Sequence, residues 1–368
     1  QIFVKTCIFV RKFYDMHKIL VLNHGSTSTK VAIYEDDKQT ELFSVRHSVD
    51  ELMKFPHVID QFDFRYDLIM NTLKEKGIAL DFSLVMGRGG MLPPVQSGTY
   101  QVNERMLGTL RKAERGEHAS NLGAFLADKI ARQIPGCKAY IADPVAVDEL
   151  DEISRISGMP EIPRESIFHA LNHKAAGRYH ASKVGKKYEE LNLVIAHLGG
   201  GVTIAAHRQG RVVDVNQGLD GFGAISPERS GTLDCGRLVK LCFSGKYTQQ
   251  ELLRKLAGKG GLIAHLGSND VQELVKKAEA GDEHVAMVLN AMSYTIGKEI
   301  GAMLAVLRGN VDGVILTGGV AFNDFVVNYV KEMVEPYARV FVYAGEDEMA
   351  ALAANAVRLL NGEQAKEF

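Results

Sequence analysis

Residues 19–26 of this 368-residue chain read Ile-Leu-Val-Leu-Asn-His-Gly-Ser, and this stretch decides the fold that the sequence predicts. The apolar run at its start is typical of a buried strand, and the small polar residues after it are typical of a tight turn. A second apolar run, Val-Ala-Ile-Tyr, follows at residues 31–34, and residues 35–38 form a polar turn. The pattern therefore predicts a β-hairpin, not a strand followed by a helix.

The same design recurs at residues 193–206, where an apolar run leads into His197-Leu198-Gly199-Gly200-Gly201 and a second apolar run follows. A unit that occurs twice at this spacing predicts two duplicated α/β domains that face each other, not a solenoid of many short repeats. Superposition of the two copies matches Gly25 with Gly199, Thr29 with Thr203 and Ala32 with Ala206.

Helical patterns and short strands connect the two copies and follow the second one. Helices are predicted to begin near Asn103 and near Ser120, and the longest is predicted to run from about residue 284 to residue 307. Short strands are expected at residues 140–142 and 314–316. No Pro- or Ser-rich linker separates the halves, so we expect a closely coupled cleft with a boundary near residues 160–190.

Composition narrows the class of protein. The net charge of -2, with both signs interspersed, argues against a nucleic-acid partner. No apolar run of about 18 residues predicts a membrane span, and the four cysteines lack metal-ligand spacing, so we expect a cytoplasmic protein with reduced thiols. We interpret residues 1–15 as an N-terminal extension ahead of a natural start at Met16; a targeting peptide is the alternative.

Three turns that follow strands offer hydroxyls or unobstructed backbone N–H groups, at residues 23–30, 197–201 and 317–320. Such groups bind phosphate oxygens, although none of the turns fits the Walker pattern. For one such turn alone, a simple glycine hairpin is the better explanation. Three of them, two being related by the repeat, favour phosphate binding.

Two arginines lie in loops rich in small residues. Arg88 lies within Met-Gly-Arg-Gly-Gly at residues 86–90, and Arg229 lies within Ser-Pro-Glu-Arg-Ser-Gly at residues 226–231. An arginine beside glycines is free to enter a cleft and bind a carboxylate or phosphoryl group with its planar guanidinium. A surface arginine is the alternative, which we disfavour for Arg88 because glycine is costly in chain entropy.

Acidic residues and histidines complete the candidates. Asp143 follows a strand and Glu348 follows a turn, positions typical of magnesium ligands; a helix N-terminal acid is an equally good interpretation of Glu348. His169 and His173 share one face of a predicted helix. Because no third ligand is evident, we favour one histidine that donates a hydrogen bond to an oxyanion over a zinc site.

Taken together, these motifs resemble the acetate kinase–butyrate kinase family of the actin, sugar-kinase and heat-shock-70 superfamily, and most of all its butyrate kinase branch. The resemblance spans residues 19 to about 360, and no single segment carries it. It implies duplicated actin-like ATPase (ribonuclease H-like) domains around a central cleft: residues 16–175 with the acyl site, and residues 176–368 with the nucleotide site, the last helix returning to the first domain. The matching segments are residues 23–30, 87–90, 116–121, 143–150, 169–174, 197–203, 226–235 and 317–323.

The resemblance also implies roles. Arg88 and Arg229 hold the carboxylate and the transferring phosphoryl group, His169 stabilises the transition state, and Asp143 and Glu348 lie near Mg²⁺. Gly89, Gly90 and Phe168 belong to the acyl site. The implied ATP/ADP contacts are Asn23, Ser26, Ser28, Lys30, His197, Gly199, Gly200, Gly201, Asp270, Gly318, Gly319 and Asn323.

One departure from acetate kinase concerns specificity. Gly89 and Gly90 stand where acetate kinase has valines, which leaves volume for a longer acyl tail. The implied function is reversible, ATP-dependent phosphorylation of butyrate or a related short- or branched-chain acid by a homo-oligomer. Acetate or propionate kinase is the alternative in the same class, and a non-metabolic actin-like ATPase is the alternative in a different class.

Overall fold

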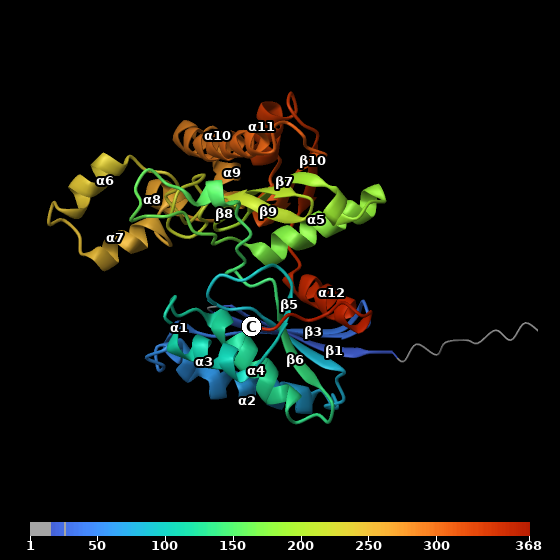
Figure 1. The fold of residues 1–368 in the computed structure, drawn as a ribbon. Helices are drawn as coiled ribbons and strands as arrows, with labels where there is room; N and C mark the ends of the chain where they lie inside the picture. The colour runs from blue at the N-terminus through green and yellow to red at the C-terminus, as the bar shows by residue number, and fades with distance from the viewer. Residues whose placement is uncertain (1–15, 26) are drawn as a thin grey trace, which may run out of the picture.

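The computed structural model describes residues 16–25 and 27–368. It contains two mixed sheets, each covered by helices on both faces (Figure 1). The predicted extension at residues 1–15 and the predicted phosphate contact Ser26 lie outside the described residues.

The first sheet has the strand order β3-β2-β1-β4-β6-β5. β1 pairs with β2 in antiparallel fashion, as the opening stretch predicted, and runs parallel to β4, which in turn runs parallel to β6. The strands are β1 (Lys18–Gly25), β2 (Ser28–Glu35), β3 (Lys38–Arg46), β4 (Leu84–Arg88), β5 (Thr99–Gln101) and β6 (Lys138–Ala142).

The second sheet has the order β11-β10-β7-β8-β9 and repeats the arrangement of the first. In each sheet three antiparallel strands are followed by two parallel ones, so the duplication inferred from the hairpins is confirmed. The strands are β7 (Asn192–Leu198), β8 (Val202–Arg208), β9 (Arg211–Val215), β10 (Gly313–Gly318) and β11 (Val340–Ala344).

Strand pairing corrects one detail of the predicted superposition. Gly25 pairs with Ser28, whereas Leu198 pairs with Val202, so the second turn is one residue longer than the first. The threonines still correspond, because Thr29 pairs with His24 and Thr203 pairs with His197. The residue equivalent to His24 is therefore His197, and both imidazoles are buried.

Helices cover the outer faces of both sheets (Figure 1). Apolar side chains of α2, α3 and α4 form one core with the first sheet, and those of α8 to α11 form another with the second sheet. The predicted helix starts at Asn103 and Ser120 are confirmed, and the long predicted helix is α10. The helices are α1 (Val49–Leu52), α2 (Phe62–Glu75), α3 (Glu104–Lys112), α4 (Leu122–Ala131), α6 (Cys235–Cys242), α7 (Gln249–Leu256), α8 (Gly261–Leu266), α9 (Val271–Glu279), α10 (Glu283–Val306) and α11 (Asp324–Val334).

Two helices lie where the halves meet. α5 (Ala170–Val184) packs on the second sheet, and α12 (Glu348–Leu360) packs on β1 and β4 of the first sheet. The chain end also returns to the first sheet, because the backbone N–H of Lys366 donates to the carbonyl of Thr99 at 2.8 Å. The return of the last helix is thus observed, while the division at residue 175 remains a prediction.

Parallel strands bring the candidate residues to two facing sheet edges. Arg88 ends β4, Asp143 follows β6, His197 lies near the end of β7, and Gly318 ends β10. Ligands of open α/β sheets bind outside the carboxyl ends of the strands, which is where these side chains lie. No helix in the described ranges is long and apolar enough to cross a membrane.

Gly87 and Gly123 let β4 and α4 approach more closely than any side chain would allow. A Cβ atom at Gly87 would lie 2.4 Å from the carbonyl oxygen of Gly123, and one at Gly123 would lie 2.2 Å from that of Arg88. We expect Gly87→Ala to lower the free energy of unfolding by about 1–3 kcal/mol, because backbone on both sides must shift. Urea denaturation monitored by circular dichroism measures this.

Gly108 provides the matched control. It lies inside α3, and no heavy atom lies within 4 Å of the Cβ that an alanine would add. Gly108→Ala should raise stability by roughly 0.5–1 kcal/mol, the usual advantage of alanine over glycine in a helix. Equal effects of the two substitutions would contradict the close-packing explanation.

Candidate active site

Arg88, Asn23 and Glu348 form a compact polar cluster that joins three distant segments. Arg88 Nη1 donates to Glu348 Oε2 at 2.9 Å and to Asn23 Oδ1 at 3.2 Å. Asn23 Nδ2 donates to the same Glu348 oxygen at 2.7 Å. The Arg88 and Glu348 side chains are 21% and 16% exposed, so this ion pair is more strongly held than a surface pair, yet solvent reaches it. The structure thus brings together three of the predicted site residues.

The glycines around Arg88 serve a different purpose from the one the sequence indicated. A Cβ at Gly89 would lie 2.6 Å from Pro144 Cβ, and one at Gly90 would lie 2.7 Å from the Cα of Asn121. The space beside both glycines is therefore filled by the protein. They do not leave volume for an acyl tail on the Cβ side; they fix the loop that carries Arg88, which keeps the guanidinium in place.

The turn at residues 198–202 is held by contacts with the segment that carries Arg229. The Ser226 hydroxyl donates to the carbonyl of Gly200 at 2.7 Å, and the backbone N–H of Glu228 donates to it at 3.0 Å. The guanidinium of Arg229 lies against Gly201, where a Cβ would be 1.9 Å from Nη1. Arg229 also donates to the carbonyl of Gly218. Gly201 is thus required because the arginine passes over it.

Histidines from α5 and β7 meet behind this turn. His169, the residue before α5, has its ring centroid 4.5 Å from that of His197. His169 Nδ1 and His173 Nε2 each lie 2.9 Å from the hydroxyl oxygen of Thr203. His169 is half-buried and His173 fully buried, so only the first is placed to meet a ligand.

Glu346 and Asn172 extend the cluster, and sequence reasoning missed both. His197 Nε2 lies 3.1 Å from Glu346 Oε2, and Asn172 Nδ2 donates to the same oxygen at 3.2 Å. Asn172 Nδ2 also lies 3.5 Å from Glu348 Oε1, so it links the two glutamates. The hydrogen bond from His197 lowers the pKa of the Glu346 carboxyl against the effect of burial, with weaker help from the Arg88 and Lys30 charges. The sequence feature that could have identified Glu346 is its position two residues before Glu348.

Asp143 is placed differently from the other candidates. Its side chain is fully buried, and its Oδ1 accepts hydrogen bonds from Ser97 Oγ at 2.6 Å and the backbone N–H of Gly98 at 2.8 Å. Its Oδ2 lies 3.4 Å from Arg178 Nη1. Asp143 also adopts a left-handed backbone with φ of 37°. These contacts fix the turn at residues 97–98; a role as a magnesium ligand remains a prediction.

The remaining predicted residues are scattered. Phe168 is buried in an apolar cluster with Val147, Leu150 and Val215, which makes it part of the core. Asp270 is exposed and caps the N-terminus of α9, accepting from the backbone N–H of Glu273 at 3.0 Å. Neither has a contact with the cluster around Arg88 among those the structure records, and their ligand roles are untested.

The ATP/ADP candidates not yet described are divided between the two halves of the chain. Gly318 has φ of 90° and packs on the carbonyl of Leu198, so no other residue fits there. Gly319 is exposed and Asn323 precedes α11. Ser28 and Lys30 lie on β2, with Lys30 exposed. Gly199 donates its backbone N–H to the carbonyl of Gly201 at 3.0 Å within the second turn.

No group of three or more His, Cys, Asp or Glu side chains suited to a metal ion occurs in the described residues. The carboxylates of Glu346 and Glu348 both contact the side-chain amide of Asn172. Two carboxylates at the edge of an anion site match the oxygen ligands that magnesium prefers when it also binds phosphate. The residues therefore fit a magnesium ion shared with a nucleotide, and not an all-protein metal cage.

Comparison with known proteins decides the family. The chain is 50% identical over 96% of its length to butyrate kinase 1 of Clostridium acetobutylicum, of which it covers 100%. The chain belongs to the acetokinase family. The family's sequence profile matches residues 162–350. A probable butyrate kinase of Phocaeicola vulgatus is 51% identical over 94% of the chain and 97% of that protein.

Solved structures agree about the fold of this acetokinase-family chain. The crystal structure of Porphyromonas gingivalis acetate kinase matches with a TM-score of 0.76 at 20% identity, covering 94% of this chain and all of that one. A propionate kinase from Francisella tularensis matches with a TM-score of 0.73 at 17% identity, covering 92% of this chain and 99% of that one. The predicted fold class and the predicted family are confirmed.

Buried histidines make the stability of this protein sensitive to acid. Burial, with weaker effects from the Arg65, His47 and Arg88 charges, lowers the pKa of His24 to about 3. Burial also lowers the pKa values of His169, His173 and His207 well below 6.5. Below pH 6.5 the unfolded chain binds protons that the native state rejects, so stability falls as pH falls, by about 1.4 kcal/mol per pH unit per histidine. Urea unfolding at pH 5.0–8.0 should show this loss between pH 6.5 and 5.0.

One variant separates this explanation from general acid denaturation. His24→Leu should reduce the dependence of the unfolding free energy on pH by about one proton, since neither ring nitrogen of His24 has a hydrogen bond within the described residues and an apolar side chain can replace the buried imidazole. An unchanged pH dependence in His24→Leu would contradict the assignment.

Proposed function

We propose that this chain is a butyrate kinase, which transfers the γ-phosphoryl group of ATP reversibly to the carboxylate of butyrate or a related short- or branched-chain fatty acid. The observation that carries this proposal is the 50% identity, over nearly the whole of both chains, to butyrate kinase 1 of Clostridium acetobutylicum. The cluster of Arg88, Glu348 and Asn23 beside two small-residue turns supports it. The expected cytoplasmic location and the homo-oligomer remain predictions.

Phosphoryl transfer depends on positioning and charge neutralisation more than on covalent chemistry. A carboxylate is already a nucleophile, so the reaction needs no general base, and we propose direct in-line attack on the γ-phosphoryl group. Arg88 and Arg229 would neutralise the carboxylate and the equatorial phosphoryl oxygens, as planar guanidinium groups do. The turns at residues 23–30 and 197–201, with Gly318, Gly319 and Asn323, would hold the nucleotide.

Magnesium would be held by Glu348, directly or through water, with Glu346 beside it. When bound with ATP, the ion supplies positive charge to the phosphate oxygens. Glu348 engages Arg88 in this structure, so a bound cation and the arginine would share its carboxylate. The sequence also proposes Asp143 as a second magnesium ligand. Its side chain is fully buried, so Asp143 would act through the groups that surround it.

The preferred acid is testable by chain length. Incubation with ATP, Mg²⁺, hydroxylamine and butyrate should yield a hydroxamate, because hydroxylamine traps acyl phosphates. We expect kcat/KM to be higher for butyrate or isobutyrate than for acetate, since each buried methylene contributes about 0.8 kcal/mol. Equal or better turnover of acetate would favour the acetate or propionate kinase alternative. ATP hydrolysis without any hydroxamate would favour a non-metabolic actin-like ATPase.

Substitution of the arginines tests the site. Arg88→Ala and Arg229→Ala should each lower kcat by on the order of 10²–10³, the range for removing one preorganised donor, and lysine should rescue only in part. Gly201→Ala should act like Arg229→Ala, because its Cβ would displace the Arg229 guanidinium. ADP titration should show little change in affinity for the arginine variants. Near-normal kcat, or loss of ADP binding together with kcat, would contradict the assigned role of that arginine.

A further inference from the structure

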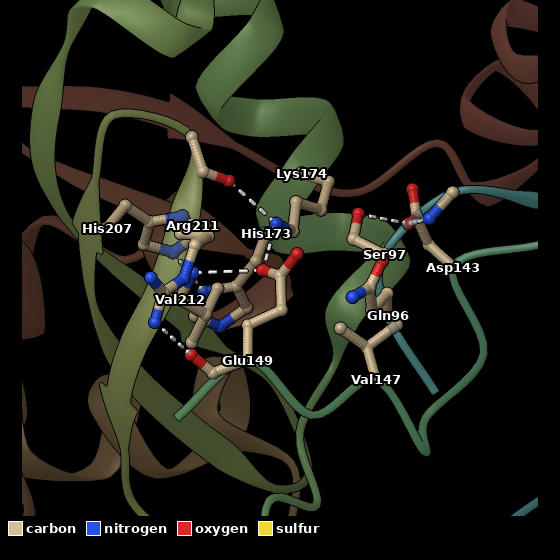
Figure 2. A network of polar contacts seen from close by, with 12 residues as sticks. Gln96, Ser97, Asp143, Val147, Glu149, His173, Lys174, His207, Arg211 and Val212 are labelled. Carbon is tan, nitrogen blue, oxygen red and sulfur yellow. Dashed lines mark hydrogen bonds and ion pairs between the residues drawn. The ribbon is translucent and has the colours of Figure 1, made fainter. Parts of the chain in front are cut away.

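A continuous chain of hydrogen bonds runs from His169 into the interior of the second half. Thr203 Oγ1 lies 2.9 Å from both His169 Nδ1 and His173 Nε2. His173 Nδ1 lies 3.2 Å from His207 Nε2, and the two rings are within 9° of parallel. His207 Nδ1 is hydrogen-bonded to the Tyr188 hydroxyl, where the chain ends. Figure 2 shows His173 and His207 next to each other, with Lys174 and Glu149 nearby.

Every group in this chain is electrically neutral. Burial lowers the pKa values of His169, His173 and His207 well below 6.5, and it raises the pKa of Tyr188 well above 10. The ammonium of Lys174, which is 1% exposed and held by Glu149 at 2.6 Å and the carbonyl of Gly210 at 2.7 Å, opposes a charge on either neighbouring imidazole. A neutral imidazole has one N–H, and a hydroxyl has one O–H.

One proton per group makes the direction of the chain all-or-none. The Thr203 hydroxyl could accept from both imidazoles only if it donated its own proton elsewhere, and the structure records no other hydrogen bond of that hydroxyl within residues 16–25 and 27–368. Each group therefore donates to one neighbour and accepts from the other, so reversal of one hydrogen bond reverses all of them. If the chain runs from Tyr188 to His169, the Tyr188 hydroxyl donates to His207 and every proton within the chain is used. If it runs the other way, the Tyr188 proton needs an acceptor, and within residues 16–25 and 27–368 the structure records no hydrogen bond of that hydroxyl except the one to His207.

The Tyr188 ring is enclosed, so its hydroxyl cannot turn to solvent. Tyr188 is 4% exposed, and a Cβ at Gly177 would lie 2.5 Å from its ring. A buried hydroxyl proton without an acceptor is strongly unfavourable. This favours the direction from Tyr188 to His169.

We propose that Tyr188 acts as a positioning residue: through His207, His173 and Thr203 it holds His169 in the tautomer that carries its proton on Nε2. In that tautomer His169 presents an N–H donor to an oxygen of the transferring phosphoryl group. In the opposite tautomer it would present a lone pair, which repels the same oxygen. The role of His169 towards phosphate rests on the proposed function, whereas the tautomer does not.

The outer end of the chain is open to a ligand. His169 is only half-buried, and its Nε2 has no hydrogen bond among those recorded for the described residues. Its ring lies 4.5 Å from that of His197, which binds Glu346 of the polar cluster. The tautomer of a histidine is set by the hydrogen bond that its other nitrogen makes, so control from Thr203 reaches the site directly.

The first test reads the tautomer without substrate. Two-bond ¹H–¹⁵N correlation spectra of protein labelled with ¹⁵N-histidine report which nitrogen of each neutral imidazole is protonated, and His169→Gln assigns the signal. We expect protonated Nε2 and unprotonated Nδ1 in the wild type, and a mixture or reversal in Tyr188→Phe. Protonated Nδ1 in the wild type, or an unchanged tautomer in Tyr188→Phe, would overturn the proposal even if butyrate is turned over normally.

The second test is a kinetic double-mutant cycle. Tyr188→Phe should lower kcat roughly two- to tenfold with little change in KM, since only the population of the correct tautomer falls. Thr203→Val disconnects His169, so adding Tyr188→Phe to it should lower kcat no further. Independent, multiplicative effects would show that Tyr188 acts on stability alone and would overturn the proposal.

Tyr343→Phe is the matched control. The Tyr343 hydroxyl makes a hydrogen bond of the same kind, 2.9 Å from His180 Nδ1, but that pair is not linked to the chain from Tyr188. This variant should keep both kcat and the His169 tautomer. A fall in kcat equal to that of Tyr188→Phe would show that loss of any Tyr–His hydrogen bond has this effect, and it would overturn the proposal. ADP titration and thermal unfolding of each variant confirm that the folded protein is being compared.

Discussion

The contact between Arg88 and Glu348 is the interaction on which the site depends. These residues are 260 positions apart in the sequence, and their side chains meet at 2.9 Å where β4 ends and α12 begins. Asn23 of β1 completes the contact, so the first hairpin, the arginine loop and the last helix are fixed relative to one another. Because Glu348 opens α12, its charge is also favourable at that helix N-terminus. The interpretation of Glu348 as a helix N-terminal acid is therefore confirmed, whereas its role as a magnesium ligand remains a prediction.

Local sequence patterns predicted what depends on local physics. Apolar runs that end in small polar residues specified both hairpins, and an asparagine or serine before a periodic segment specified helix starts at residues 103 and 120. The repeat of the hairpin was visible because each copy consists of two apolar runs joined by a turn of small residues. The sequence did not reveal that the two turns differ in length by one residue. The glycines align equally well in either register, and only the strand pairing decides between the two.

What the sequence could not predict are contacts across the fold. Gly89 and Gly90 appeared to leave space, but Pro144 and Asn121 fill it, and these neighbours come from other segments. Asp143 was predicted as a magnesium ligand because it follows a strand, yet its carboxylate is buried and contacted by donors from Ser97, Gly98 and Arg178. Asn172 and Glu346 carry no motif at all. Each of these depends on which elements lie side by side, and residue type alone does not contain that information.

The charge state of His169 is consistent with the chemistry proposed for the site. In the proposed site Arg88 and Arg229 would already supply positive charge, which would attract ATP, ADP and acyl phosphate alike. A third cation there would stabilise bound substrate and product as strongly as the transition state, and uniform binding does not accelerate the chemical step. A neutral imidazole that donates a directed hydrogen bond adds no long-range attraction and is selective for oxygens at one position. Burial of His169, and of the Thr203–His173–His207 chain behind it, keeps the imidazole neutral. The same burial that lowers acid stability therefore provides a donor whose direction is fixed before the ligand arrives.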